Sequence, residues 1–173
     1  KGAAPMQVDL LAGRVQLSFA TLQTVLKEVN SGQLRALGVT ALKRIATPGG
    51  DVLHALKASD PGFRDFGEAY FSWVMPGAVK AWKCHLRMTL NLVVPVGLVR
   101  FVFCSPDPQP VFRAEIVGES RYARLTVPPG VWFGFQGISE TPSLLMNLAD
   151  IEHDPAEVLR KTVSEFAYDW TVK

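Results

Sequence analysis

Short apolar segments divided by Pro and Gly fill residues 68–148, and they constrain the fold more than any other feature of the sequence. Many of these segments alternate apolar and polar residues, which is the period of a strand with one buried face. The expected strands are 69–75, 80–87, 90–94, 98–103, 114–117, 123–127, 131–136 and 143–148. Strands this short and this regularly spaced predict a β-sandwich or barrel.

Local signals predict how two of the connections are made. Pro95-Val96-Gly97 predicts a hairpin between strands 90–94 and 98–103, because Gly97 can adopt a positive φ. After the last strand, Asp154 can cap a helix, Pro155 suits its first position and Glu157 completes a capping box. The sequence therefore predicts a C-terminal helix from residue 155 to about 161, with Asp154 and Glu157 as its capping residues.

The first part of the chain has a different pattern. A strand is expected at 15–19, a helix at 22–29 and a second strand at 34–40, which together form a βαβ unit. One such unit is too small to bury both faces of a sheet by itself. The spacing of the apolar residues changes near the turn at 46–51, from a mixed helix and strand pattern to a strand pattern. We therefore expect a short N-terminal α/β segment, 1–44, and a mainly β domain, 45–173.

Composition excludes several function classes. The net charge is only +2 and the basic residues are scattered, which argues against a nucleic-acid partner. No apolar run reaches the roughly 18 residues of a membrane span, and the chain does not start like a signal peptide. Cys84 and Cys104 lie in apolar strand-like segments and are expected to be buried thiols without a zinc site. We therefore expect a soluble cytoplasmic protein with no membrane partner.

Several motifs of the β region occur in the order and spacing of a known family. They lie at 50–54, 77–89, 94–97, 127–135, 153–157 and 168–170. On these motifs, residues 45–173 resemble the cupin family of dTDP-4-dehydrorhamnose 3,5-epimerases, close to the branch of the dTDP-sugar 3,4-ketoisomerases. The resemblance implies a jelly-roll barrel, also called a double-stranded β-helix. It further implies a homodimer that needs no cofactor and acts on a nucleotide-linked 4-keto sugar.

The family's chemistry is proton transfer beside a ketone, in which a His removes the proton and a Tyr returns one to the other face. Here Lys83 stands at the position of that His, and His85 stands where the ketoisomerase branch has a second His. Lys83 and His85 share one face of the expected strand, because strand side chains alternate. The family tyrosines fall near Asn147 and His153, and Phe133 replaces a further family His. His85 and Lys83 are the predicted acid/base pair.

Other residues are predicted to bind the substrate. Lys80 matches a family Arg, and Arg87 could pair with a phosphate or with a carboxylate at the barrel mouth. Trp82 and Trp132 could stack on a base or sugar ring, or could pack in the core. Asn147 completes the predicted substrate-binding set. A metal-dependent cupin is disfavoured, since the chain has three His residues and Lys83 replaces the first ligand of that site.

Residues 1–44 resemble part of the periplasmic solute-binding proteins of tripartite tricarboxylate transporters. The resemblance is carried by residues 1–5, 9–17, 19–22, 31–40 and 43–44. It covers part of one lobe, so it implies no complete carboxylate cleft, and the segment could instead dock on the barrel or cover a strand edge. Two functions follow for the whole chain: a sugar-nucleotide epimerase or isomerase, or a catalytically silent cupin that binds a sugar nucleotide or serves as a dimeric structural module.

Overall fold

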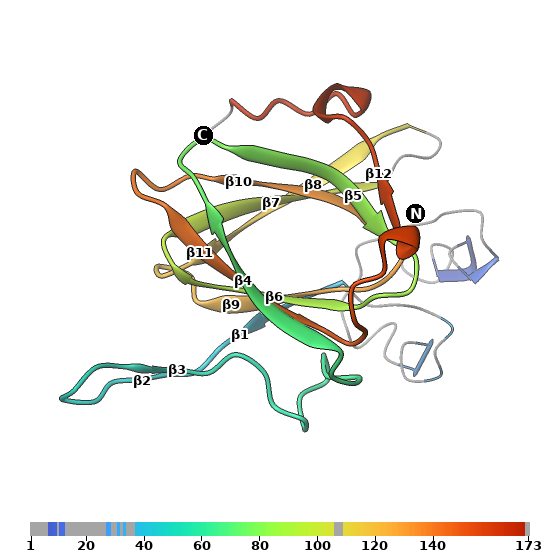
Figure 1. Ribbon diagram of the computed structural model, residues 1–173. Helices are drawn as coiled ribbons and strands as arrows, with labels where there is room; N and C mark the ends of the chain where they lie inside the picture. Colours follow the sequence, from blue (N-terminus) through green and yellow to red (C-terminus); the bar gives the residue numbers. More distant parts are fainter. Residues whose placement is uncertain are drawn as a thin grey trace.

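The protein, described by a computed structural model, consists mainly of two five-stranded antiparallel sheets that face each other around a shared interior (Figure 1). The described residues are 37–105 and 109–171, together with 7–9, 11–12, 27–28, 31 and 33. The strands are β1 Gly38–Ala41, β2 Arg44–Ile45, β3 Val52–Leu53, β4 Glu68–Val74, β5 Val79–His85, β6 Leu90–Val96, β7 Leu98–Ser105, β8 Val111–Gly118, β9 Ala123–Val127, β10 Trp132–Gly137, β11 Ser143–Ala149 and β12 Val158–Arg160. The first sheet has the order β1-β9-β6-β11-β4 and the second has the order β12-β5-β10-β7-β8, so the predicted mainly β jelly-roll barrel is confirmed.

The interior between the two sheets is apolar over most of its length. Alternation turns one side chain in two inward on each strand, and inward residues such as Leu92, Phe101, Leu125 and Phe133 are at most 2% exposed. They belong to one continuous cluster with residues of both sheets. This packing fixes the register of the strands, because a shift by one residue would turn every apolar side chain outward.

All eight strands expected between residues 69 and 148 are present, with ends that differ by up to three residues. The predicted hairpin at residues 95–97 is wrong. Gly97 has the expected positive φ of 77°, but β6 belongs to the first sheet and β7 to the second. Both strands pair with partners distant in sequence, which lets each sheet bury one face against the other.

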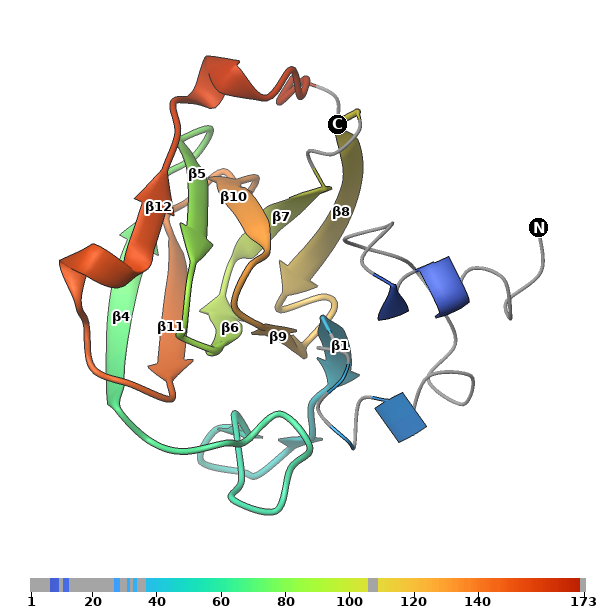
Figure 2. The same cartoon turned by 90° about the vertical axis from the view of Figure 1, so that its right-hand side faces the viewer.

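The predicted C-terminal helix is also wrong. Asp154 does cap a turn, accepting a hydrogen bond from Ala156 N at 2.9 Å, but the turn is a 3-10 helix of three residues, η1 (Pro155–Glu157). The chain then becomes β12, which pairs with the free edge of β5 (Figure 2). A helix of two turns is marginal on its own, whereas an exposed strand edge offers backbone partners at once.

The last part of the chain covers the outer face of the second sheet. A second 3-10 turn, η2 (Val163–Glu165), leads into a segment whose Phe166 and Trp170 pack on Trp82. Trp82, Val102, Cys104, Phe166 and Trp170 form a second buried cluster there. The second sheet is therefore covered on both faces.

The N-terminal part of the chain contributes one strand to the barrel. β1 pairs with β9 at the edge of the first sheet, so residues 38–41 cover a strand edge there. The hairpin of β2 and β3 extends away from the barrel (Figure 1). Residues 27–28 of the expected helix are helical, and the expected strand at 15–19 lies outside the described residues. Within the part that the structure describes, no helix is long and apolar enough to cross a membrane.

Candidate active site

β5 carries the two predicted acid/base residues on its interior face. Lys83 pairs in register with the inward-facing Phe133 of β10, and the ring of His85 stacks on the ring of Phe133 with centroids 6.4 Å apart. Trp82 and Cys84 alternate with them and turn to the outer face. The structure thus brings Lys83 and His85 to the same end of the barrel interior.

His85 forms a buried pair with Glu157. His85 is 7% exposed and Glu157 is 2% exposed, and His85 Nδ1 donates a hydrogen bond to Glu157 Oε1. Glu157 Oε2 also accepts hydrogen bonds from the backbone N–H groups of residues 86, 87 and 88, each at 3.2 Å. These contacts fix the carboxylate, which in turn fixes the imidazole ring. Nε2 of His85 is buried and has no hydrogen-bond partner among the described residues.

The charges of this pair follow from its surroundings. Burial lowers the pKa of His85 below its usual value, while the hydrogen bond with Glu157 opposes that shift. Burial would raise the pKa of Glu157, but hydrogen bonds from His85 and from the backbone outweigh it and lower the pKa. At neutral pH the pair is a neutral imidazole beside a carboxylate. Nδ1 then carries the proton, and Nε2 presents a lone pair that can accept another.

Glu157 is the functional residue that the sequence analysis missed. Its spacing from Asp154 indicated a capping box, and that local signal gave it the wrong role. In the structure its side chain turns away from the start of η1 and toward β5, 72 residues away in sequence. The motif at 153–157 was the only signal that could have drawn attention to it.

Basic side chains surround Lys83. A β-bulge between β5 and β10 places Lys80 opposite Phe135, although Lys83 is opposite Phe133. Arg160 of β12 lies directly opposite Lys83 in the register, so both side chains share the interior face. A cavity of about 320 Å³ is lined by Lys80, Lys83, Phe135 and Arg160, and it also borders Trp82 and Lys161. Burial, then Arg160 and Lys80, lower the pKa of Lys83 to about 8.

The first sheet contributes uncharged polar groups to the interior. Asn147 of β11 is 1% exposed, and neither atom of its side-chain amide has a hydrogen-bond partner among the described residues. Tyr70 of β4 lies opposite Asn147 in the register and therefore on the same face. Of the other two tyrosines, Tyr122 donates its hydroxyl to His54 O at 3.0 Å, and Tyr168 packs against Trp82 in the outer aromatic cluster.

The side chains of three predicted binding residues pack or pair elsewhere, although Trp82 also borders the 320 Å³ cavity. The indole of Trp82 packs in the outer cluster and is 1% exposed, and Trp132 packs edge-on against Phe166 on the same outer face. Arg87 does not continue the alternation of β5, because the strand ends at His85. Its exposed guanidinium pairs with Asp154 at 2.6 Å, which is the carboxylate alternative considered for it above.

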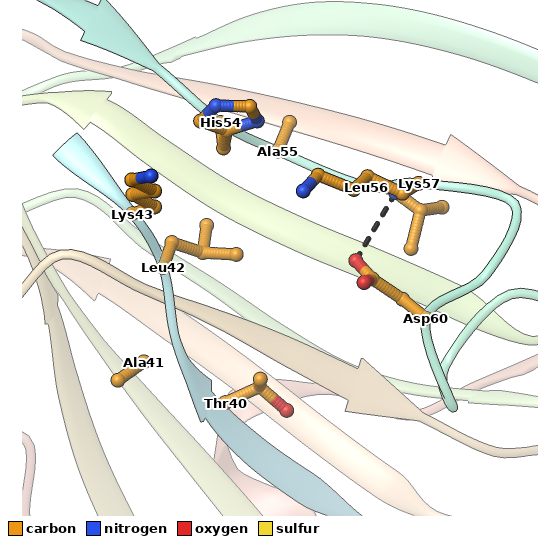
Figure 3. A pocket seen from close by; sticks show the side chains of 9 residues that line it. All are labelled: Thr40, Ala41, Leu42, Lys43, His54, Ala55, Leu56, Lys57 and Asp60. Atoms are coloured by element: carbon orange, nitrogen blue, oxygen red, sulfur yellow. Dashed lines mark hydrogen bonds between the residues drawn. The ribbon is translucent and has the colours of Figure 1, made fainter. Parts of the chain in front are cut away.

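A second cavity, of about 160 Å³, lies between β1 and the segment 54–60 (Figure 3). Its carboxylate, Asp60, accepts a hydrogen bond from Lys57 N at 3.1 Å and pairs with Arg124 at 2.7 Å. Asp60 therefore has a structural role. The cavity shares no residue with the interior site.

Nowhere in the described ranges do three or more His, Cys, Asp and Glu side chains group so that they could hold a metal ion.

Comparison with known proteins identifies the family. The crystal structure of a dTDP sugar isomerase from Desulfovibrio desulfuricans G20 is 35% identical and superposes with a TM-score of 0.74, over 79% of this chain and 92% of that one. The chain belongs to the dTDP-sugar isomerase and epimerase family. A curated relative in Haloferax volcanii, the probable low-salt glycan biosynthesis epimerase Agl13, is 28% identical over 114 residues, 61% of this chain and 73% of the relative.

A more distant member of this group of structures shares the fold. QdtA, a sugar 3,4-ketoisomerase from Thermoanaerobacterium thermosaccharolyticum solved in complex with TDP, is 21% identical with a TM-score of 0.62, over 72% of this chain and 88% of that one. No family model matches the sequence. The predicted resemblance to the epimerase and isomerase family is confirmed, and the resemblance of residues 1–44 to solute-binding proteins stays a prediction.

Proposed function

We propose that the protein is a metal-independent epimerase or isomerase of a dTDP-4-keto-6-deoxyhexose, acting by proton transfer beside the 4-ketone. The observation that carries this proposal is the buried pair of His85 and Glu157, with Nε2 of His85 unpartnered and facing the interior. A carbon acid next to a ketone needs a base with a pKa near neutrality, held in one orientation. His85 is an uncharged imidazole at neutral pH, and Glu157 holds it in one orientation.

The proposed reaction begins when Nε2 of His85 takes a proton from the carbon beside the ketone. The electron pair of the broken C–H bond moves toward the 4-oxygen, and Glu157 stabilises the imidazolium that forms. In this orientation the 4-oxygen lies beside Lys83. For inversion, the proton must return from the other side of the sugar ring. Tyr70, on the facing sheet, is the hydroxyl we assign to that step.

The basic residues fit a diphosphate next to the sugar. With the sugar held between His85 and Lys83, which lie about 6.8 Å apart along the strand, its diphosphate would lie toward Arg160 and Lys80. Among the described residues, none of these three cations forms an ion pair with a carboxylate. The TDP bound to QdtA supports a nucleotide in the corresponding barrel, and Asn147 offers an amide to a sugar hydroxyl.

The second candidate function is a catalytically silent cupin that binds a sugar nucleotide. It is favoured by Phe133, which is fully buried in the interior at the position of a family His, and by Asn147 at the position of a family Tyr. The enzyme and the silent cupin would both bind the nucleotide at this site, but only the enzyme would transfer a proton.

Deuterium exchange separates the two functions. Proton NMR of dTDP-4-keto-6-deoxyglucose in D₂O should show that the protein speeds loss of the signal beside the ketone well above the rate in buffer, and that a new sugar spectrum appears. A folded protein that binds TDP without raising the exchange rate would contradict the enzymatic proposal and leave the silent cupin.

We also propose a homodimer that forms through the outer face of the first sheet. On its edge strand β4, Phe71 and Trp73 are 60% and 58% exposed, and Met75 just beyond is 53% exposed. Leu144 and Met146 of β11 lie beside Trp73 and Phe71 in the register and extend the same face. An apolar patch of this kind on a soluble family member is typical of a subunit interface.

Replacing Trp73 by Lys is expected to convert the dimer to a monomer, because it places a charge at the centre of this patch. Light scattering after gel filtration gives the mass. Val163→Lys is the matched control, since Val163 is 41% exposed on η2 and outside the patch. A dimer that persists in Trp73→Lys, or a wild-type monomer at micromolar concentration, contradicts the proposed interface.

We place the protein in the cytoplasm. Cys84 and Cys104 are both free and buried, which suits a reducing compartment.

A further inference from the structure

Lys83 is an unusual amine in this protein. Its Nζ lies over two aromatic rings, 5.0 Å from the centroid of Phe133 and 5.8 Å from that of Phe135. No described carboxylate forms an ion pair with it, because Glu157 is directed to His85 instead. A lysine that only contributed charge to a structural network would be expected to have an acidic partner. Lys83 instead points into the cavity where the ketone of the proposed substrate would lie.

The neighbours of Lys83 favour the uncharged amine. Arg160 lies directly opposite on β12, and Lys80 lies across the bulge, so cations approach Lys83 from two sides. These groups and burial lower the pKa of Lys83 to about 8. At pH 7 roughly a tenth of the molecules then carry the free amine, a fraction roughly 300 times that of an ordinary lysine.

We propose that Lys83 acts as a nucleophile and forms a covalent imine with the 4-ketone of the sugar nucleotide. The inference rests on the proposed function, since it requires a keto sugar in this cavity. Lysines that are desolvated in an apolar pocket or placed beside another cation form such imines with carbonyl substrates. The position of Lys83 meets both conditions, between Phe133 and Phe135 and opposite Arg160.

The step balances without any further reactant. The Nζ lone pair attacks the carbonyl carbon, and the oxygen takes up the amine proton to give a carbinolamine. Loss of water with one more proton gives the protonated imine. His85 then removes the neighbouring C–H proton, and the electron pair moves toward the positive nitrogen to form an enamine. After a proton returns to carbon, water hydrolyses the imine and restores the ketone and the free amine.

This chemistry gives Lys83 and His85 separate roles. A protonated imine withdraws electrons more strongly than a ketone, so the neighbouring C–H bond becomes more acidic. His85 is two residues from Lys83 on the same strand face, about 6.8 Å along the chain. The two side chains can therefore reach adjacent carbons of one sugar ring, one forming the imine and the other moving the proton.

Reductive trapping tests the proposal. The protein is incubated with dTDP-4-keto-6-deoxyglucose and sodium cyanoborohydride, and its intact mass and peptides are measured. The expected product is an adduct on Lys83 with the mass of the substrate less one oxygen atom. Lys83→Arg keeps the charge and should give no adduct and at least 100-fold slower exchange. Lys57→Arg, at an exposed position outside this cavity, is the matched control and should keep the adduct on Lys83.

The outcomes separate this proposal from the proposed function. If the wild-type protein exchanges the proton beside the ketone but gives no adduct, the imine is overturned. Exchange at the wild-type rate in Lys83→Arg overturns it as well. In both cases the proposed epimerase or isomerase activity stands. An adduct confined to another lysine also overturns the imine. A protein that binds TDP but neither exchanges nor traps the sugar contradicts both. Circular dichroism shows whether Lys83→Arg remains folded, and TDP binding shows whether its site remains formed.

The pH dependence gives a second readout. The groups that face Lys83 are Lys80 and His85 of β5, Arg160 of β12 and Glu157 of η1. A nucleophilic amine must be deprotonated, so trapping should speed up as pH rises toward about 8 and then level off. A lysine that acted only as an ammonium ion would give the opposite slope, with exchange falling as pH rises through about 8.

Discussion

Replacing His85 by Asn is expected to slow proton exchange beside the 4-ketone by about 10²–10⁴-fold, the usual contribution of a positioned general base. The Asn side-chain N–H₂ can take the place of Nδ1 and keep the hydrogen bond to Glu157 Oε1. No lone pair then replaces Nε2, the buried atom that has no partner among the described residues. The variant should fold and bind TDP within a few-fold of the wild-type affinity.

The measurement is the exchange rate by proton NMR, with TDP binding by calorimetry as the measure of an intact site. His153→Asn is the matched control, because His153 is exposed, whereas His85 is buried and paired with Glu157. If His85→Asn exchanges at the wild-type rate, the base is another residue. If His85→Asn and His153→Asn lose exchange equally, the loss does not show that His85 is the base.

The strands of the barrel were predictable because each is short, alternates and ends at Pro or Gly. The same alternation correctly placed Lys83 and His85 on one face. The sequence does not show which strands meet, so the step of β6 and β7 into different sheets and the pairing of β12 with β5 were missed. In both cases a local signal, a turn or a helix cap, competed with pairing between distant segments.

Two parts of the site depend on such distant pairing. Lys80 lines the same cavity as Lys83 only because of a β-bulge, which strict alternation would not predict. Tyr70 was not a candidate because the family position for the proton donor is on β11. Only the register shows that Tyr70 of β4 lies directly opposite that position, at Asn147. Strand registry and bulges, which are set by the whole sheet, therefore decide the chemistry of the site.

We expect both the stability of the fold and the proposed proton transfer to depend on the side chain of Glu157. Replacing it by Ala leaves His85 Nδ1 and the backbone N–H groups of residues 86, 87 and 88 without their acceptor in a buried place. Breaking a buried pair in this way costs about 3–5 kcal/mol of unfolding free energy. Urea unfolding measures that loss, and Glu152→Ala, at an exposed position, should change stability by less than about 0.5 kcal/mol.

Glu157→Gln separates the catalytic role from the structural one. The amide oxygen can still accept hydrogen bonds from the backbone of residues 86–88, so the variant should remain folded. Its N–H₂ would then face His85 Nδ1 and favour the other tautomer, in which Nε2 carries the proton and cannot act as a base. Exchange beside the ketone should fall by about 10²–10⁴-fold. Exchange at the wild-type rate would contradict the role of Glu157 in orienting His85.

The pH dependence of stability gives an independent check on the same pair. The lowered pKa of Glu157 means that its carboxylate stabilises the folded state above the ordinary value of 4.5, and this contribution is lost as pH falls through the folded pKa. The lowered pKa of His85 means that the folded state resists protonation, so stability starts to fall once pH drops below 6.5. Glu157→Gln should abolish the loss of stability due to Glu157 below pH 4.5. An unchanged acid profile in that variant would show that other carboxylates govern acid unfolding.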